Sequence, residues 1–193
     1  MANNVKDVVA GKPLATGGVW GAPLGTALPT DETTALNVAF KALGYVGSDG
    51  LVETADRSTN KVTAWGGDTV KVLQTEFSLS YKFTLLGTVN SDVLEAVHGA
   101  ANVTTTAATS GSGAKSTVKI TSDQIPPQAW VFEIKDGNAR IRICVPNGQI
   151  TSVGDITYAD GDAVGYEVTV EAYYDTTLAA QAVKYINDGQ PTA

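Results

Sequence analysis

The sequence has few of the side chains that carry most enzyme chemistry. It contains one histidine, His98, and one cysteine, Cys144. A Cys/His pair would need these two residues to meet through folding, and a Ser/His/Asp triad would depend on the same histidine. The sequence also lacks a glycine-rich phosphate loop and any His/Cys spacing typical of a metal site. We therefore expect no catalytic residues, no cofactor and no metal, and we predict that the protein is not an enzyme.

Charge is also sparse, and its balance is acidic. Charged residues make up 17% of the chain, the formal net charge is -7 and the pI is about 4.6. These values argue against a protein that grips nucleic acid by its phosphates, which requires clustered lysine and arginine. They leave open a surface that nucleic acid slides past. The single cysteine excludes an internal disulfide, and its place in an apolar segment predicts a buried, inert thiol.

Long hydrophobic runs are missing as well. No window approaches about 18 uninterrupted apolar residues, and the first residues show no basic region followed by an apolar core. We expect a soluble protein without a signal peptide and without a membrane partner. The 193 residues suffice for one substantial domain, and abundant glycine with little charge favours strands and turns over helices.

The longest regular pattern runs through residues 69–86, which contain no Gly, Pro, Asn or Asp. From Leu73 onward odd positions are apolar and even positions polar, which predicts a strand with one wet face. The opposite parity of Val70 and Val72 predicts a β-bulge near residues 72–73. At roughly 3.3 Å per residue the strand would span about 60 Å, longer than one small domain needs.

A glycine turn at residues 64–68 precedes this strand. A two-residue loop at Gly66-Gly67 places Val62 opposite Lys71 and Lys61 opposite Val72, which is not a core-like pairing. Either the register differs, or this end of the hairpin stands outside the domain.

The second half predicts further antiparallel strands. Alternation in residues 130–134 and 139–145 indicates a hairpin, and a loop at Asp136-Gly137 would place Glu133 opposite Arg140. Asn147-Gly148 and Asp160-Gly161 are typical turn pairs, which would be followed by strands over residues 149–158 and 164–174. Earlier in the chain, residues 40–46 and 51–55 are expected to form short strands.

Two segments have helical character. Residues 90–99 begin with a capping asparagine, carry acids in the first turn and end at a glycine, and His98 in the last turn suits the helix dipole as a cation. Residues 177–186 also favour a short helix, and residues 102–117 read as a mobile loop or weak strand edges. The predicted fold is mainly β, an antiparallel β-barrel or sandwich with one short packed α-helix at about 90–98 and a long β-hairpin.

The first 34 residues are rich in Gly and Pro, and their apolar residues follow neither a helical nor a strand periodicity. We therefore predict an extended N-terminal arm (1–34) and a domain (35–193). The arm is too apolar for a solvated linker. Our hypothesis is that it orders against a neighbouring subunit, and the alternative is that it folds over its own domain.

Several polar and aromatic features allow two interpretations. Asp160-Gly161-Asp162 could ligate calcium, although such a pair is more typical of a turn. Trp20, Trp65 and Trp130 could build a sugar-stacking platform, although Trp130 is in phase with core residues. The polar faces of the two long amphipathic strands are either simply exposed to solvent or line a water-filled bore.

The chain resembles the major tail subunit of long-tailed siphophages, closely the type found in phages of mycobacteria and related actinobacteria. The combination and order of several segments carry the resemblance: Met1-Ala2-Asn3-Asn4-Val5-Lys6, the arm through Leu28-Pro29-Thr30-Asp31, Ala39-Phe40-Lys41-Ala42-Leu43-Gly44-Tyr45-Val46, Asp49-Gly50-Leu51, Ala64-Trp65-Gly66-Gly67-Asp68, and Ala180-Gln181-Ala182-Val183-Lys184-Tyr185-Ile186-Asn187-Asp188-Gly189.

The resemblance implies a structural virion protein without turnover. It implies hexameric rings, stacked into a tail tube, that conduct viral DNA from capsid to host, with tape-measure and tail-terminator proteins as further partners. The protein would be made in the host cytoplasm and reside in the virion tail. Six copies at -7 each carry a formal charge of -42, which would repel DNA phosphates from the bore if much of it faces inward.

Residue roles follow as hypotheses. The polar parity of the two strands predicts a lumen-facing set: Gln74, Glu76, Ser78, Ser80, Lys82, Glu167, Thr169 and Glu171. Apolar segments without a core-like pattern predict contacts between rings: Trp20, Trp65, Gly66, Gly67 and Asp68. The alternatives are a carbohydrate-binding or adhesin β-sandwich, and the inner-tube protein of a contractile injection system.

Overall fold

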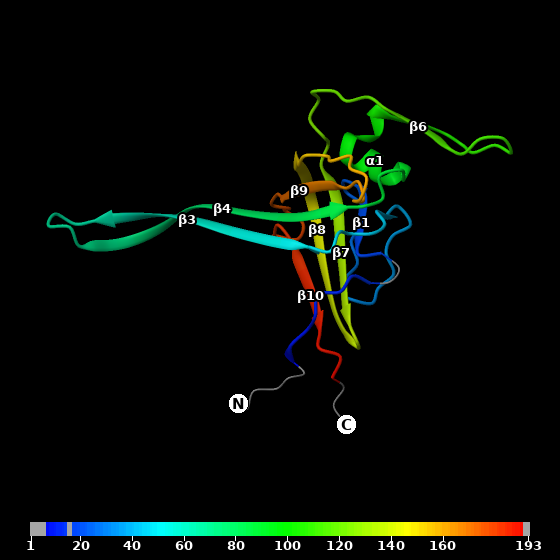
Figure 1. Cartoon of the computed structure of the whole chain (residues 1–193). Helices are drawn as coiled ribbons and strands as arrows, with labels where there is room; N and C mark the ends of the chain where they lie inside the picture. The colour runs from blue at the N-terminus through cyan, green and yellow to red at the C-terminus, as the bar shows by residue number, and fades with distance from the viewer. Residues whose placement is uncertain (1–6, 15–16, 191–193) are drawn as a thin grey trace.

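A computed structural model of the chain describes residues 7–14 and 17–190. It consists of an eight-stranded antiparallel sheet, a separate two-stranded arm and one α-helix (Figure 1). The main sheet has the order β2-β1-β7-β8-β9-β4-β3, with β10 paired to β8. This arrangement confirms the predicted mainly β, antiparallel fold. The bounds are β1 (Val19–Pro23), β2 (Lys41–Ala42), β3 (Val52–Thr63), β4 (Thr69–Leu85), α1 (Ser91–His98), β5 (Val103–Thr106), β6 (Lys115–Val118), β7 (Gln128–Asp136), β8 (Ala139–Val153), β9 (Tyr166–Ala172) and β10 (Val183–Asn187), with a 3₁₀ turn at Ala100–Asn102.

The main sheet folds back on itself around an aromatic core. β4 and β7 are not hydrogen-bonded neighbours, yet the ring centroids of Tyr81 and Phe132 lie 5.1 Å apart, and those of Phe83 and Trp130 lie 6.0 Å apart. The long strand β8 makes this possible, because its first half pairs with β7 and β10 and its second half with β9. Trp130 is 0% exposed, so its predicted place in the core is confirmed.

Helix α1 caps one end of this core as its sequence predicts. The Asn90 side chain accepts a hydrogen bond from the backbone N–H of Asp92 at 2.9 Å, and Gly99 ends the helix with a bond to the Glu95 carbonyl. Val93, Leu94, Ala96 and Val97 are buried. The ring of His98 packs edge-on against Tyr166, and burial lowers the pKa of His98. Because burial favours the neutral imidazole, the cationic role expected at the helix end is not supported.

The N-terminal segment extends the sheet beside β7 of the β7–β8 hairpin. β1 pairs with β7 on one side and β2 on the other, and Ala22, Phe40 and Val131 form a second apolar cluster with Cys144. In the single subunit this part of the predicted arm therefore folds over its own domain, the second of the two placements considered. Residues 1–6 and 15–16 of the arm lie outside the described residues.

The cysteine has the environment that its sequence position predicts. Cys144 is free, buried in this second cluster and only 1% exposed. Burial raises the pKa of its thiol to about 12. The thiol is therefore protonated near neutral pH and is a poor nucleophile.

The β7–β8 hairpin has a different register from the predicted one. Asp136 pairs with Ala139, so the two-residue loop is Gly137-Asn138, and Glu133 lies opposite Arg142 instead of Arg140. Gly137 adopts φ +59°, a value that glycine takes without strain at the first loop position of such a turn. The prediction placed the loop one residue too early.

The predicted turn at Asn147-Gly148 is wrong, because both residues lie inside β8. Glycine serves close packing here. A side chain at Gly148 would begin 2.7 Å from Trp130 Cδ1 and 2.9 Å from Val170 Cγ1, and the Trp130 indole N–H donates to the Gly148 carbonyl at 3.0 Å. Strand β8 thus packs directly against Trp130 at the point where its pairing partner changes from β7 to β9.

Gly148→Ala is expected to destabilise the fold by about 1–3 kcal/mol, because the added methyl group overpacks the core against Trp130. Urea unfolding of the unassembled subunit measures the effect. Gly161→Ala is the matched control, since beyond its two chain neighbours no other residue lies within 4 Å of the position of its added methyl group. Equal stability of the two variants would contradict the packing role of Gly148.

The predicted C-terminal helix is also wrong. Residues 183–187 form β10, which pairs with residues 140–144 of β8. An isolated helix of ten residues is marginal in water, whereas the open edge of β8 satisfies a full row of backbone groups. The ion pair between Lys184 Nζ and Glu53 Oε1, 2.6 Å long, further joins β10 to β3.

The remaining strands follow the predictions with changed ends. The low-complexity segment does form weak strands, β5 and β6, which pair into a second projecting arm. The strand expected over 40–46 shrinks to β2, and the one expected over 51–55 lengthens into β3. β8 ends at Val153 and β9 covers residues 166–172.

Candidate assembly surfaces

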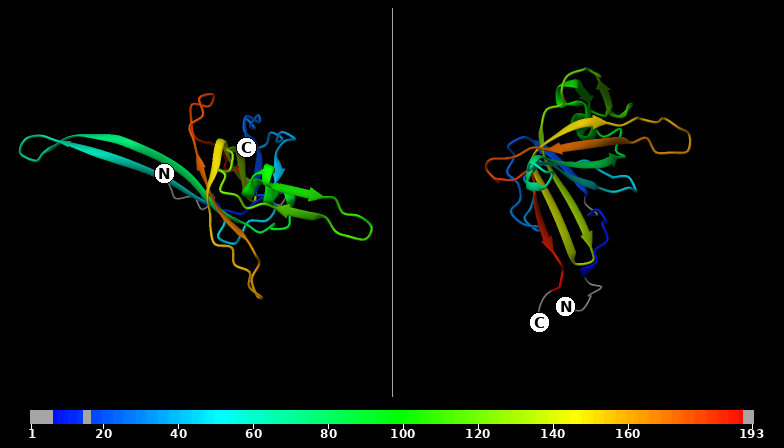
Figure 2. Two further views of the ribbon diagram at one scale, coloured as in Figure 1. Left: turned by 90° about the horizontal axis from the view of Figure 1, so that it is seen from above. Right: turned by 90° about the vertical axis from the view of Figure 1, so that its left-hand side faces the viewer.

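The β3–β4 hairpin stands out from the body of the subunit (Figures 1 and 2). All twelve residues of β3 and the first eight residues of β4 are exposed. From Leu79 onward, alternate residues of β4 enter the core. The long strand therefore has a distal part that contacts little of its own subunit and a proximal part built into the sheet.

The predicted two-residue loop at Gly66-Gly67 is wrong, because Thr63 lies opposite Thr69 and the turn covers residues 64–68. The pairs predicted beyond it are nevertheless found, since β4 skips Val70. Lys61 lies opposite Val72 and Val62 opposite Lys71, and this end does stand outside the domain. Two irregularities skip one residue each in β4, at Thr75 and Val70, instead of the single bulge predicted near residues 72–73. Parity alone could not place them, because the distal part has no buried face to pin the register.

The tip of the hairpin is a tight turn that presents one large aromatic ring. The Ala64 N–H donates to the Asp68 carbonyl at 2.8 Å, and the chain reverses through Gly66 and Gly67 at φ +115° and +96°. Trp65 is 107% exposed. Exposed apolar side chains also follow the adjoining strands: Val62, Val70, Val72 and Leu73. Such a concentration of exposed apolar surface is typical of an interaction site.

The polar residues predicted to act together on β4 and β9 do share one sheet face. Ser80 lies opposite Glu171 and Lys82 opposite Thr169. The Lys82 ammonium and the Glu167 carboxylate form an ion pair of 2.9 Å with half-exposed side chains. The opposite face of the same strands lies in the core. The sheet thus brings together seven of the predicted residues: Glu76, Ser78, Ser80, Lys82, Glu167, Thr169 and Glu171.

Gln74 does not join this group. The irregularity at Thr75 turns it to the side of Phe77, where Arg57 Nη1 donates to Gln74 Oε1 at 2.9 Å. The Arg57 guanidinium also stacks over the Phe77 ring, 4.3 Å from its centroid. A bulge shifts the phase of every residue beyond it, so the parity that grouped Gln74 with Glu76 ends at Thr75.

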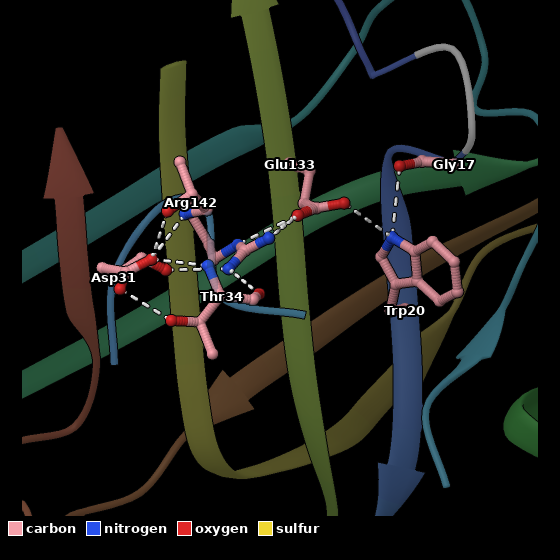
Figure 3. A network of polar contacts seen from close by, with 7 residues as sticks. Gly17, Trp20, Asp31, Thr34, Glu133 and Arg142 are labelled. Atoms are coloured by element: carbon pink, nitrogen blue, oxygen red, sulfur yellow. Dashed lines mark hydrogen bonds and ion pairs between the residues drawn. The ribbon is translucent and has the colours of Figure 1, made fainter. Parts of the chain in front are cut away.

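Trp20 lies at the edge of a polar network that ties the N-terminal segment to the sheet, with the buried pair of Glu133 and Arg142 at its centre (Figure 3). Its indole N–H lies 3.2 Å from both Glu133 Oε2 and the Gly17 carbonyl. Glu133 pairs with Arg142, whose Nε donates to Glu133 Oε1 at 2.9 Å. Arg142 Nη1 also donates to the carbonyls of Asp31 and Thr34, each at 2.7 Å. Trp20 is only half-buried, and its contact with a neighbouring subunit stays a prediction.

Sequence reasoning missed the role of Arg142 and of Asp31 in this network. Side-chain and backbone hydrogen bonds from Thr34 and Thr33 hold the pKa of Asp31 below its usual range, and they shape the loop whose carbonyls receive Arg142. Arg142 occupies a position of its strand that alternation assigns to the solvent face. Alternation alone does not predict that another segment of the chain covers such a side chain. Glu133 on the neighbouring strand was the available signal, but the predicted register placed it opposite Arg140 instead of Arg142.

The structure does not support the two alternative sites, the sugar-stacking tryptophan platform and the calcium site. Trp130 is fully buried, so the three tryptophans do not form one exposed platform. Over residues 7–14 and 17–190, no three His, Cys, Asp or Glu side chains gather as a metal site. Asp160, Gly161 and Asp162 lie in an exposed turn. In the same described part of the chain, no helix is long and apolar enough to cross a membrane.

Comparisons with known proteins agree with an assembly role. The model of the family described as phage tail tube protein matches residues 1–193, the full length of the chain. No curated protein matches it significantly. The chain therefore belongs to the phage tail tube protein family and is a structural subunit of the virion tail that assembles with copies of itself into a tube.

Proposed function

We propose that the subunit forms hexameric rings, that these rings stack into the tail tube, and that the tube conducts viral DNA during ejection. The polar face shared by β4 and β9 is the observation that carries this proposal. A sheet with one core face and one continuous wet face suits the wall of a water-filled bore. Tape-measure and tail-terminator proteins would be the further partners, with the type found in mycobacteriophages as the expected subclass.

The charges on this face suit passage of DNA without binding. Glu76, Glu167 and Glu171 outnumber the single lysine, Lys82, which is already paired with Glu167. β3 adds Asp56 in register with Ser78. An acidic face repels phosphates, so DNA would slide past it without sequence-specific contacts. Gln74 is not part of this proposed lumen set because it lies on the other side of the hairpin.

The hairpin tip would supply contacts between successive rings. Its exposed apolar residues belong to neither apolar cluster of the described subunit, and Trp65 is the largest of them. Exposure of the apolar side chains of the tip to water is unfavourable in a monomer. A neighbouring subunit that covers the tip would remove this exposure. Trp20 and the N-terminal segment would contribute to the same interface from the subunit body.

Cysteine labelling of assembled tubes tests the lumen assignment. Ser80→Cys places a thiol on the β4–β9 face, and Ser110→Cys places one on the exposed loop of the β5–β6 arm as the matched control. We expect both thiols to react with a small maleimide, but only the Ser110 variant to react rapidly with a maleimide coupled to a bulky polymer. Equal reaction of both with the bulky reagent would contradict the lumen assignment. The native thiol is buried and does not interfere.

A further inference from the structure

A groove lies on the side of the subunit away from the hairpin, between α1, β1 and the loop before β7. Its volume is about 530 Å³. The lining is mostly apolar and includes Pro23, Leu24, Leu43, Ala96, Pro126 and Pro127. Three charged side chains also line it: Lys41, Asp92 and Glu95. A cavity of this size and composition is typical of a binding pocket.

We propose that this groove receives the hairpin tip of a second copy of the chain, with the Trp65 ring as its anchor. The inference rests on the proposed stacking of rings and adds the receiving site, which the stacking itself does not specify. Tryptophan seated in a pocket is among the commonest energetic centres of protein interfaces. A fully exposed Trp65 has about 150–250 Å² of surface to bury there.

The charges of the tip and the groove are complementary. The tip carries two cations and one anion, Lys61, Lys71 and Asp68, on either side of the tryptophan. The groove carries two anions and one cation, Asp92, Glu95 and Lys41. None of these six side chains forms an ion pair with another described residue of its own subunit. Complementary charges would select the orientation in which the hairpin enters.

The placement of the two surfaces suits continued growth. In Figure 1 the hairpin tip lies at one side of the subunit, whereas β1 and α1 lie at the other. A contact between two different surfaces of the same chain is heterologous and can repeat from copy to copy, whereas a self-complementary patch would stop at a dimer. The exposed hairpin is also long enough, since the twelve residues of β3 extend about 40 Å.

A second groove provides the natural comparison. It has a volume of about 410 Å³ and lies between the N-terminal segment and the residues before β10, lined by Ala27, Leu28, Leu178 and Tyr185. Its single carboxylate, Asp175, already accepts hydrogen bonds from the backbone of Thr177 and Leu178. It therefore lacks the free acidic pair that would match the lysines of the tip.

Cross-linking in assembled tubes tests the proposal. One variant combines Ala64→Cys at the tip with Ala100→Cys at the proposed groove, and the matched control combines Ala64→Cys with Ala27→Cys at the second groove. After treatment with a short bis-maleimide, we expect the first pair to give a ladder of covalent dimers and larger species. The control pair should stay largely monomeric under denaturing electrophoresis.

Electron microscopy of each sample before cross-linking separates the possible failures. Tubes in which the control pair cross-links, or in which neither pair does, would overturn the groove assignment and leave tube formation intact. Absence of tubes from the unmodified protein would contradict the proposed function itself, and the groove assignment with it. If only the cysteine variants fail to form tubes, a charge exchange decides. The double substitution Lys61→Glu and Lys71→Glu at the tip should suppress assembly. Adding Asp92→Lys and Glu95→Lys at the groove to the same chain should restore assembly, and failure to restore it would overturn the proposal.

Discussion

Trp65→Ala is expected to block tube formation while leaving the subunit folded. The side chain is fully exposed at the tip of the hairpin, so its removal takes no contact away from the core. In the tube it would be a buried anchor, and truncation of such a residue costs about 2 kcal/mol or more per contact, more than tenfold in affinity. Sedimentation and electron microscopy measure the fraction of protein in tubes.

The control for this variant is the fold of the monomer. Thermal unfolding followed by circular dichroism should give the same midpoint for Trp65→Ala and the unmodified protein. Trp65→Phe, which keeps an aromatic ring, should retain part of the assembly. Normal tubes from Trp65→Ala at the same protein concentration would refute the assignment of the tip to an interface between subunits.

Glu133→Gln is expected to destabilise the subunit by about 3–5 kcal/mol. Glu133 and Arg142 are 8% and 6% exposed, and the substitution leaves the guanidinium buried without its counter-charge. The same change weakens the acceptor for the Trp20 indole N–H. Because this network ties the N-terminal segment to the sheet, the segment should also exchange its amide hydrogens faster.

Glu167→Gln is the matched control for this prediction. Glu167 also pairs with a basic side chain, Lys82, but both side chains are about half exposed. Exposed ion pairs contribute about 0–1 kcal/mol, so urea unfolding should show little change. Similar losses for both substitutions, or a loss below 1 kcal/mol for Glu133→Gln, would contradict the structural importance of the buried pair.

Patterns with one buried face were predictable from the sequence. The alternation along residues 77–85 and 166–172 identifies core and solvent faces, because a slip by one residue would expose the whole apolar set. Helix α1 was equally clear, since its cap, apolar stripe and terminal glycine agree. The exposed hairpin was predictable in another way, from a pairing of lysine with valine that no core would tolerate.

Features that depend on a neighbouring segment were not predictable. Gln74 changed sides because a bulge at Thr75 interrupts a strand part that no core constrains. Gly148 was mistaken for a turn because close packing on Trp130 and chain reversal both favour glycine. Residues 183–187 became a strand only because β8 offered an open edge. For Gly148 and residues 183–187 the deciding partner is another strand, whereas for Gln74 it is the absence of a core contact that would fix the register.

Electron microscopy of the purified, unmodified protein in negative stain shows whether the chain assembles into a tube by itself. We expect hollow tubes of uniform diameter built from stacked rings with sixfold symmetry. Tubes with another rotational symmetry would contradict the hexameric ring. A protein that remains a folded monomer at every concentration and salt condition tried would contradict the proposed self-assembly and the roles assigned to the hairpin and to the β4–β9 face.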